Sequence, residues 1–179
     1  MPYPWPNKGR YEVIEYGFEH LKDLDRTIKC VAEIDRSVQF KFSYHCFTDS
    51  LKKSGDFRRR FVDPGVPDED RVFCPKRWLL SLKLADLMRS GIEKKRLVST
   101  AGCQWVLNER IPGMSRPYVI YFKFGIGRPG HPLVINVNSA FVRGDGEVKG
   151  QRYRFTAILK KAADGERVCD GSNLEKEFA

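Results

Sequence analysis

The stretch YVIYFKFGIGRPGHPLVINVNSAFV, residues 118–142, determines the expected fold. Its two halves are rich in β-branched and aromatic residues, and their side chains alternate with the period of a β-strand. The segment between them contains Pro and Gly, which are typical of a turn. The stretch therefore predicts two antiparallel strands, at 117–127 and 132–142, joined by a turn at Pro129-Gly130-His131-Pro132.

Further strands are predicted on both sides of this hairpin. RLVSTAGCQWVLN (96–108) precedes it and RYRFTAILKK (152–161) follows it, and both have the composition of strands. Near the N-terminus, TIKCVAEI (27–34) and SVQFKFSYHCF (37–47) flank Asp35-Arg36 and predict a second hairpin. One face of the sheet is expected to be apolar core, made of Tyr118, Ile120, Phe122, Phe124, Leu133, Ile135, Val137, Tyr153, Phe155, Ala157 and Leu159.

The segment PKRWLLSLKLADLMRSG (75–91) predicts one prominent helix. Pro75 suits the first helical position and Gly91 suits the C-terminal cap. The apolar stripe expected to pack on the sheet consists of Trp78, Leu79, Leu82, Leu84, Ala85, Leu87 and Met88. The expected fold class is α+β, with a mainly antiparallel sheet of five to six strands, this helix packed on it, and an N-terminal β-hairpin.

The chain of 179 residues has the length of one domain. The domain is expected to span 11–163, between an irregular arm (1–10) and a polar tail (164–179). The pattern of residues 11–25 is ambiguous between a helix and a strand, and a helix or short irregular turn is favoured there. The several turn signals in 48–71 predict a long loop. The sequence lacks an apolar run long enough for a membrane span, and its first residues lack the pattern of a signal peptide, so a cytoplasmic location is expected.

Nothing in the sequence predicts a metal or another cofactor. The five cysteines, Cys30, Cys46, Cys74, Cys103 and Cys169, are odd in number and widely spaced. Zinc sites and disulfide frameworks use closely paired cysteines, so reduced thiols are expected. GIGRPG (125–130) superficially resembles a phosphate-binding loop. It is expected between antiparallel strands and opens no helix, so that interpretation fails.

Positive charge points to a polyanionic partner. The formal charge is +9 and the isoelectric point is near 9.4, so RNA or another nucleic acid is the expected partner. A basic surface that serves only solubility is the alternative. Two basic clusters flank the acidic segment 63–70. The first contains Lys52, Lys53, Arg58, Arg59 and Arg60, and the second contains Lys76, Arg77, Lys83, Arg89, Lys94, Lys95 and Arg96.

The segment FSYHCFTD (42–49) places His45 next to Cys46 in an expected strand. Adjacent strand residues point to opposite faces, so the two side chains cannot easily bind one metal ion or form one catalytic pair. Cys46 is expected in the core. His45 is expected on the polar face, either as a hydrogen-bonded surface histidine or as an acid–base group. A nucleophilic Cys46 or Cys103 is a further alternative that no local signal favours.

The sheet face opposite the core is expected to carry Thr100, Gln104, Asn108, Lys123, Asn136, Asn138, Arg154 and Thr156. A merely solvated face would show the same alternation. Lys123, Asn136 and Asn138 have low strand propensity, however, and a binding role would explain their positions. With Arg143 and His131 they would supply the cations, amides and imidazole that phosphodiester cleavage without a metal ion needs.

The strand at 132–142 contains Ser139, Ala140 and Phe141 near its end. Together with the preceding helix and the four-stranded sheet, this motif resembles the metal-independent ribonuclease toxins grouped around barnase, EndoU, colicin and RelE, over about residues 75–160. The resemblance implies that Ser139 helps to hold a phosphate and that an antitoxin is a protein partner. Those families carry an active-site histidine ahead of the sheet, where this chain has His20 and His45.

The resulting hypothesis is an RNA-binding protein that acts as a metal-independent ribonuclease. His45 or His131 would be the general acid or base, and Lys123 and Arg143 would stabilise charge on the phosphorane. The candidates for nucleic-acid binding are Lys52, Lys53, Arg58, Arg59, Arg60, Lys76, Arg77, Asn136, Asn138, Ser139 and Arg154. The alternative is a non-catalytic module that binds nucleic acid or another protein.

Overall fold

A computed structural model describes residues 28–29, 37–54, 60–63, 66–94, 96–100, 104–125 and 131–168. The expected arm at 1–10, the ambiguous segment 11–25 and most of the expected tail lie outside these residues. The same holds for several residues that the sequence singled out, namely His20, Cys30, Arg58, Arg59, Cys103 and Cys169.

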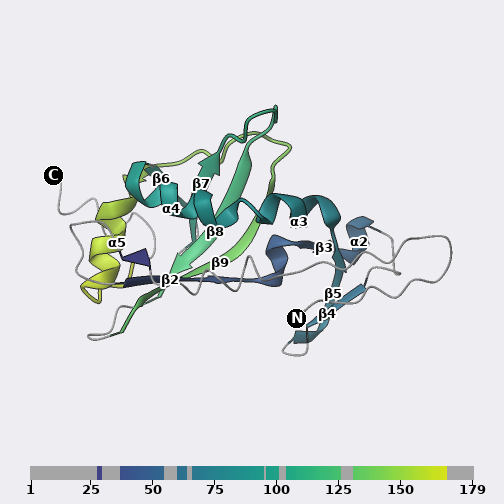
Figure 1. Ribbon diagram of the computed structural model, residues 1–179, viewed down its shortest axis with the longest axis horizontal. Helices are drawn as coiled ribbons and strands as arrows, with labels where there is room; N and C mark the ends of the chain where they lie inside the picture. Colours follow the sequence, from purple (N-terminus) through teal and green to yellow (C-terminus); the bar gives the residue numbers. More distant parts are fainter. Residues whose placement is uncertain are drawn as a thin grey trace.

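Seven strands of the described residues form the main sheet, in the spatial order β1-β2-β9-β8-β7-β6-β10 (Figure 1). They are β1 (Ile28–Lys29), β2 (Ser37–Phe42), β6 (Arg96–Thr100), β7 (Gln104–Glu109), β8 (Tyr118–Phe124), β9 (Leu133–Val142) and β10 (Arg152–Arg154). Neighbouring strands are antiparallel except β2 and β9, which are parallel. The predicted α+β class with a mainly antiparallel sheet is confirmed, although the sheet is mixed.

The predicted hairpin at 118–142 forms β8 and β9, and a β-bulge interrupts its register. Tyr121 pairs with Ser139, whereas Phe122 pairs with Val137, so Asn138 is the extra residue. A bulge shifts the alternation of the strand that contains it. Val137 and Ala140 therefore both face the core, and both are buried.

The first strand pair shows only part of the predicted N-terminal hairpin. β1 pairs antiparallel with β2, Ile28 with Val38 and Lys29 with Ser37, and the connecting residues lie outside the described part. β2 ends at Phe42, earlier than expected, and is followed by the 3-10 helix η2 (Tyr44–Cys46). The prediction that His45 lies in a strand was therefore wrong.

The predictions of two other strands, at 96–108 and 152–161, were also partly wrong. The segment 96–108 forms two strands, β6 and β7, which pair antiparallel with Thr100 opposite Gln104. In 152–161, β10 covers only three residues and α5 (Phe155–Ala163) follows. The buried residues of α5 are Phe155, Ile158, Leu159, Ala162 and Ala163, which recur with the period of a helix. Ala157, expected in the core of a strand, is exposed.

The predicted helix at 75–90 is divided into α3 (Pro75–Ser81) and α4 (Leu84–Lys94). The residues of α4 that are buried in the hydrophobic core include Leu84, Met88 and Ile92. Leu79 and Leu82, expected in the core, are 58% and 43% exposed.

Gly91 does not cap a helix but lies inside α4. A Cβ atom at this position would lie 2.7 Å from Cδ2 of Leu107 on β7. The glycine therefore allows α4 to approach the sheet closely, which is a reason for glycine that the sequence pattern did not reveal.

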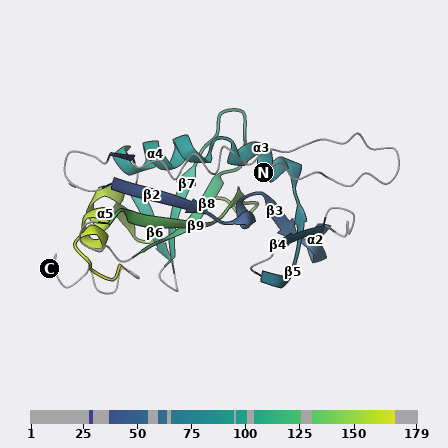
Figure 2. The same ribbon diagram turned by 60° about the horizontal axis from the view of Figure 1, so that its bottom comes forward.

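The prediction of a long loop at 48–71 was wrong, because this segment forms most of a second sheet. Its strands are β3 (Thr48–Ser50), β4 (Arg60–Asp63) and β5 (Val66–Phe73), in the order β3-β5-β4, and α2 (Leu51–Ser54) follows β3. Asp63 and Val66, which flank the Pro64-Gly65 turn signal, are paired. This small sheet lies beyond one end of the main sheet, beside α3 (Figure 2).

The main core lies between one face of the main sheet and the helices α3, α4 and α5. Its largest fully buried side chains include Trp105, Tyr118, Phe40, Phe122 and Phe155. Of the predicted core face, Tyr118, Ile120, Phe122, Leu133, Ile135 and Val137 are all buried. None of the helices in the described part of the chain is long and apolar enough to cross a membrane.

The opposite face of the sheet is not the open polar surface that the sequence predicted. A second apolar cluster, Val98, Val106, Val119 and Val148, lies on it, and Tyr121 packs against the cluster. Asn108, a predicted polar-face residue, donates from Nδ2 to the Val148 carbonyl at 3.0 Å and accepts from the Val148 amide at 2.9 Å. Asn108 therefore holds the segment after β9 against the sheet.

Candidate functional site

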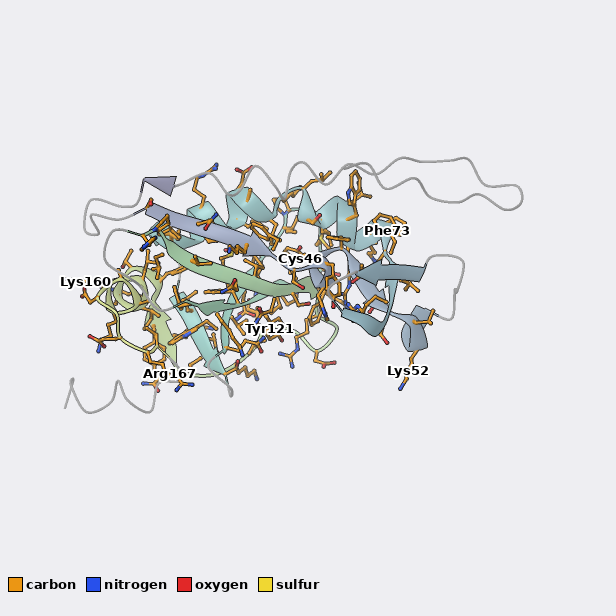
Figure 3. All side chains as sticks on the ribbon, turned by 90° about the horizontal axis from the view of Figure 1, so that it is seen from below. Cys46, Lys52, Phe73, Tyr121, Lys160 and Arg167 are labelled. Atoms are coloured by element: carbon orange, nitrogen blue, oxygen red, sulfur yellow. The ribbon has the colours of Figure 1, made fainter. Side chains whose placement is uncertain are left out.

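A hollow of about 570 Å³ lies where the small sheet meets one end of the β8–β9 hairpin. One side is formed by η2, β3, β5 and α3, and the other by β8, β9 and the residues after β9. The lining side chains and backbone come from His45, Asp49, Ser50, Arg71, Arg77, Tyr121, Ser139, Phe141, Val142, Arg143, Gly144 and Asp145. Figure 3 shows Tyr121 on the side of the main sheet away from α3 and α4. We call this hollow the arginine pocket.

His45 reaches the arginine pocket because β2 ends at Phe42 and a tight turn follows it. The Ser43 hydroxyl accepts a hydrogen bond from the His45 amide at 3.3 Å, and the Cys46 amide donates to the Ser43 carbonyl at 3.0 Å. This capping turns the chain out of the sheet. The His45 ring lies 4.6 Å from the Tyr44 ring, measured between centroids, and is partly exposed.

Cys46 points away from the pocket into the core, as predicted, and is fully buried. Burial raises the pKa of the Cys46 thiol to about 12, and nearby Arg77 opposes part of this rise. Burial also raises the pKa of Tyr118 well above its usual range, with a further rise from Cys46. Both groups therefore stay neutral at cellular pH. The alternative of a nucleophilic Cys46 is not supported, because the nucleophile is the thiolate.

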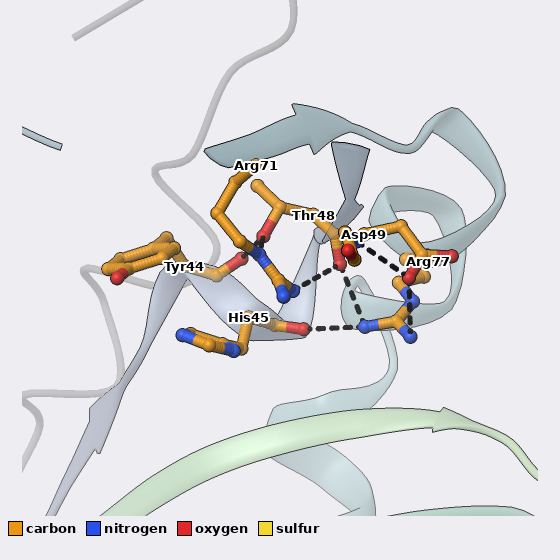
Figure 4. Close-up of polar contacts among 7 residues, drawn as sticks. Tyr44, His45, Thr48, Asp49, Arg71 and Arg77 are labelled. Atoms are coloured by element: carbon orange, nitrogen blue, oxygen red, sulfur yellow. Dashed lines mark hydrogen bonds and ion pairs between the residues drawn. The ribbon is translucent and has the colours of Figure 1, made fainter. Parts of the chain in front are cut away.

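Arg77, in the first turn of α3, connects the two sides of the pocket. Its Nη1 donates to the carbonyls of His45 at 3.0 Å and Thr48 at 2.7 Å, and its Nη2 lies 3.4 Å from Oδ1 of Asp49 (Figure 4). Its guanidinium carbon lies 5.1 Å from the centroid of the Phe141 ring, within the range of a cation–π contact. The Arg77 side chain is only 16% exposed, so its position is fixed.

Arg71 enters the pocket from β5. Its Nε donates to Oγ1 of Thr48 and its Nη2 to the Thr48 carbonyl, each at 3.1 Å (Figure 4). Thr48 is fully buried, and its hydroxyl donates to the Tyr44 carbonyl at 2.9 Å. Two arginines are thus held by the backbone of one short segment, 45–48, before any ligand binds.

The opposite side of the pocket is formed by the two strands at the bulge. Tyr121 and Ser139 are opposite each other across β8 and β9. Arg143 follows β9, where its amide donates to the Pro117 carbonyl at 3.0 Å and fixes the chain direction. Tyr121, Ser139 and Arg143 therefore line the same pocket as His45.

Four predicted site residues come together in the arginine pocket: His45, Arg77, Ser139 and Arg143. Sequence reasoning missed Arg71 and Tyr121. Arg71 was not found because its strand was interpreted as part of a loop. The alternation of β8 places Tyr121 opposite the core residues Ile120 and Phe122, and this signal could have identified it.

Other predicted site residues lie elsewhere. Lys123 and Asn136 are paired across β8 and β9 and both are exposed, but they lie beyond the bulge from the pocket. His131 is exposed and precedes β9. The part of β9 from Leu133 to the pocket residue Ser139 is about 20 Å long at the usual rise per residue, so His131 lies at the far end of this strand. His45 lines the arginine pocket, whereas His131 and Lys123 are not among the residues that line it.

The remaining predicted binding residues are dispersed. Lys52 on α2 and Lys76 on α3 are exposed, and Arg154 is exposed at the edge strand β10. Asn138 is the half-buried extra residue of the bulge, and Lys53 and Arg60 belong to α2 and β4. Among the residues that the structure describes, no group of three His, Cys, Asp or Glu side chains could hold a metal ion.

These features define a class of protein, an α+β domain whose main sheet meets a small second sheet at an arginine-rich pocket. A model of the YjaZ family matches residues 9–163, which is most of the chain. The chain therefore belongs to the YjaZ family. No curated protein and no solved structure gives a significant match.

Proposed function

We propose that the protein binds RNA, with a backbone phosphate in the arginine pocket, and that it cleaves the RNA there without a metal ion. One observation carries the proposal. Three arginines, Arg71, Arg77 and Arg143, line the same hollow as the imidazole of His45 and the hydroxyl of Ser139.

The arginines support phosphate binding. A guanidinium group is planar and always charged, and its N–H donors match the spacing of phosphate oxygens. Arg71 and Arg77 are already oriented by hydrogen bonds to the backbone at 45–48, so less conformational freedom is lost when the ligand binds. Asp49 and Asp145 also line the pocket, but Asp49 forms an ion pair with Arg77. The arginines outnumber the carboxylates.

The histidine supports cleavage, because an imidazole can accept a proton near neutral pH. In the proposed reaction, His45 accepts the proton of a ribose 2′-hydroxyl, whose oxygen attacks the adjacent phosphorus. The bond between phosphorus and the 5′-oxygen breaks, a 2′,3′-cyclic phosphate forms, and the leaving 5′-oxygen takes a proton from water. Arg71, Arg77 and Arg143 stabilise the charge that develops on the phosphorane, and Ser139 orients the phosphate.

The test is to incubate the purified protein with total RNA in EDTA, beside His45→Ala and the matched control His131→Ala. His131 is exposed and lies outside the pocket, so its loss should leave cleavage intact. Loss of the His45 imidazole should lower the cleavage rate about 100-fold or more. Intact RNA with retained binding would leave a non-catalytic RNA-binding module. If RNA did not bind at low salt, the proposal would be refuted altogether.

A further inference from the structure

Two aromatic rings on neighbouring strands lie side by side in the arginine pocket. Tyr121 of β8 and Phe141 of β9 are stacked, with ring centroids 5.6 Å apart and planes inclined by 13°. Both are partly exposed and both line the hollow. Tyr121 pairs with Ser139 in the sheet, so the two rings are diagonal neighbours next to the Ser139 hydroxyl.

Contacts on both strands hold this pair of rings in place. Tyr121 packs against the apolar cluster of Val98, Val106, Val119 and Val148 on the outer face of the sheet. The Arg77 guanidinium lies over the Phe141 ring, 5.1 Å from its centroid. Since Arg77 is itself bound to the backbone of His45 and Thr48, the rings and the phosphate-binding arginines form one fixed unit.

We infer that Tyr121 and Phe141 form a stacking surface for an unpaired nucleobase, beside the phosphate that the arginines hold. The inference rests on the proposed function and narrows its substrate to single-stranded RNA. Aromatic rings in a groove of positive charge bind single strands, because every unpaired base offers a face for stacking. A base within a duplex is already stacked on its neighbours and cannot reach the rings. The volume of the hollow, about 570 Å³, is in the range of small-molecule sites.

Simple packing of the outer sheet face could also bring two rings together. Such a pair would be expected to lie away from any site, covered by the rest of the protein. Here the pair is partly exposed and shares one hollow with His45, Ser139 and Arg77. A ligand whose phosphate met Arg77 would therefore have the Phe141 ring within reach.

The experiment compares two RNA hexamers with the same ribose–phosphate backbone, hexauridylate and an abasic hexamer. Both are titrated at low salt into the His45→Ala protein, so that neither is cleaved. Hexauridylate should bind about tenfold more tightly than the abasic hexamer, the order of one base stacked on an aromatic ring. Tyr121→Leu should abolish this preference and leave the affinity for the abasic hexamer unchanged, and Tyr121→Phe should restore the preference.

The outcomes separate this inference from the proposed function. Equal binding of the two hexamers by the His45→Ala protein would overturn the stacking surface and leave the phosphate site standing. If neither hexamer bound, the proposed function would fail first. If Tyr121→Leu still binds the abasic hexamer, the variant is folded. If Tyr121→Leu does not fold, the same comparison is made with Phe141→Leu. A twelve-base-pair RNA duplex that competed as well as hexauridylate would also contradict the inference.

Discussion

Arg77 connects three parts of the molecule through one side chain. It begins on α3, hydrogen-bonds the backbone between η2 and β3, and covers the Phe141 ring of β9. The sequence singled out Arg77 as a member of a basic cluster and as a candidate for nucleic-acid binding, on the basis of its charge. Its contacts depend on η2 and on the second sheet, neither of which the local pattern predicted. The charge could be predicted from the sequence, but its structural role could not.

A lysine at this position would keep the charge and lose the fork of donors. Arg77→Lys should therefore lower the free energy of unfolding by about 1–3 kcal/mol, measured by urea denaturation, because at least one backbone carbonyl loses a charged donor. The matched control is Arg89→Lys. Arg89 is exposed on α4 and pairs with the exposed Asp86, so its change should stay within about 0.5 kcal/mol. Equal losses in the two variants would show that Arg77 does not connect these elements.

Cys46 should make the folded state less stable in alkali. Its pKa is about 12 in the folded protein, against 9.0 for an ordinary thiol, so the unfolded chain loses this proton first. The contribution of the protonated Cys46 thiol to the free energy of unfolding is fully present below pH 9. It decreases as the pH rises towards 12, by up to about 1.4 kcal/mol per pH unit. Cys46→Ala should be less stable at pH 7 because of the cavity, but its stability should fall less steeply above pH 9. Parallel curves for the two proteins would contradict the buried, neutral thiol.

The helices show where sequence periodicity succeeded and where it failed. The start of α3 at Pro75 was predicted correctly, and so was the burial of Leu84 and Met88. The break at Leu82-Lys83 was missed because the apolar stripe is broad enough to fit one continuous helix. α5 was missed because RYRFT favours a strand locally, while the packing of Ile158 and Leu159 in the core favours a helix.

The break between α3 and α4 can be tested by comparing two apolar truncations. Met88→Ala should lower the free energy of unfolding by about 2–5 kcal/mol, since Met88 is fully buried. Leu82→Ala should cost less than about 1 kcal/mol, because Leu82 is 43% exposed. If the helix were continuous with Leu82 in the core, Leu82→Ala would instead lower the free energy of unfolding by as much as Met88→Ala. Chemical denaturation of both variants under the same conditions is the measurement.

At the scale of the whole molecule, the pocket exists because two sheets meet. The small sheet contributes Arg71, α3 contributes Arg77, and the main sheet contributes Tyr121, Ser139 and Phe141. The central hairpin and the apolar face of the main sheet were predictable, because strand alternation is a local signal. The parallel pairing of β2 with β9 and the bulge at Asn138 are not local, and they decide which polar residues meet. This is why His45 and Ser139 could be proposed separately, whereas only the structure shows that they line one pocket and that Lys123 and His131 do not line it.

The most direct test of the account is the salt dependence of RNA binding by Arg143→Gln and by its control Arg154→Gln. Arg143 lines the pocket, whereas Arg154 is exposed at the edge strand β10. Affinity for single-stranded RNA is measured at several salt concentrations, with His45→Ala as the background. Loss of one phosphate contact should weaken binding and lower the slope of log affinity against log salt by about 0.7 for Arg143→Gln only. An unchanged slope for Arg143→Gln, or an equal decrease for Arg154→Gln, would contradict phosphate binding in the arginine pocket.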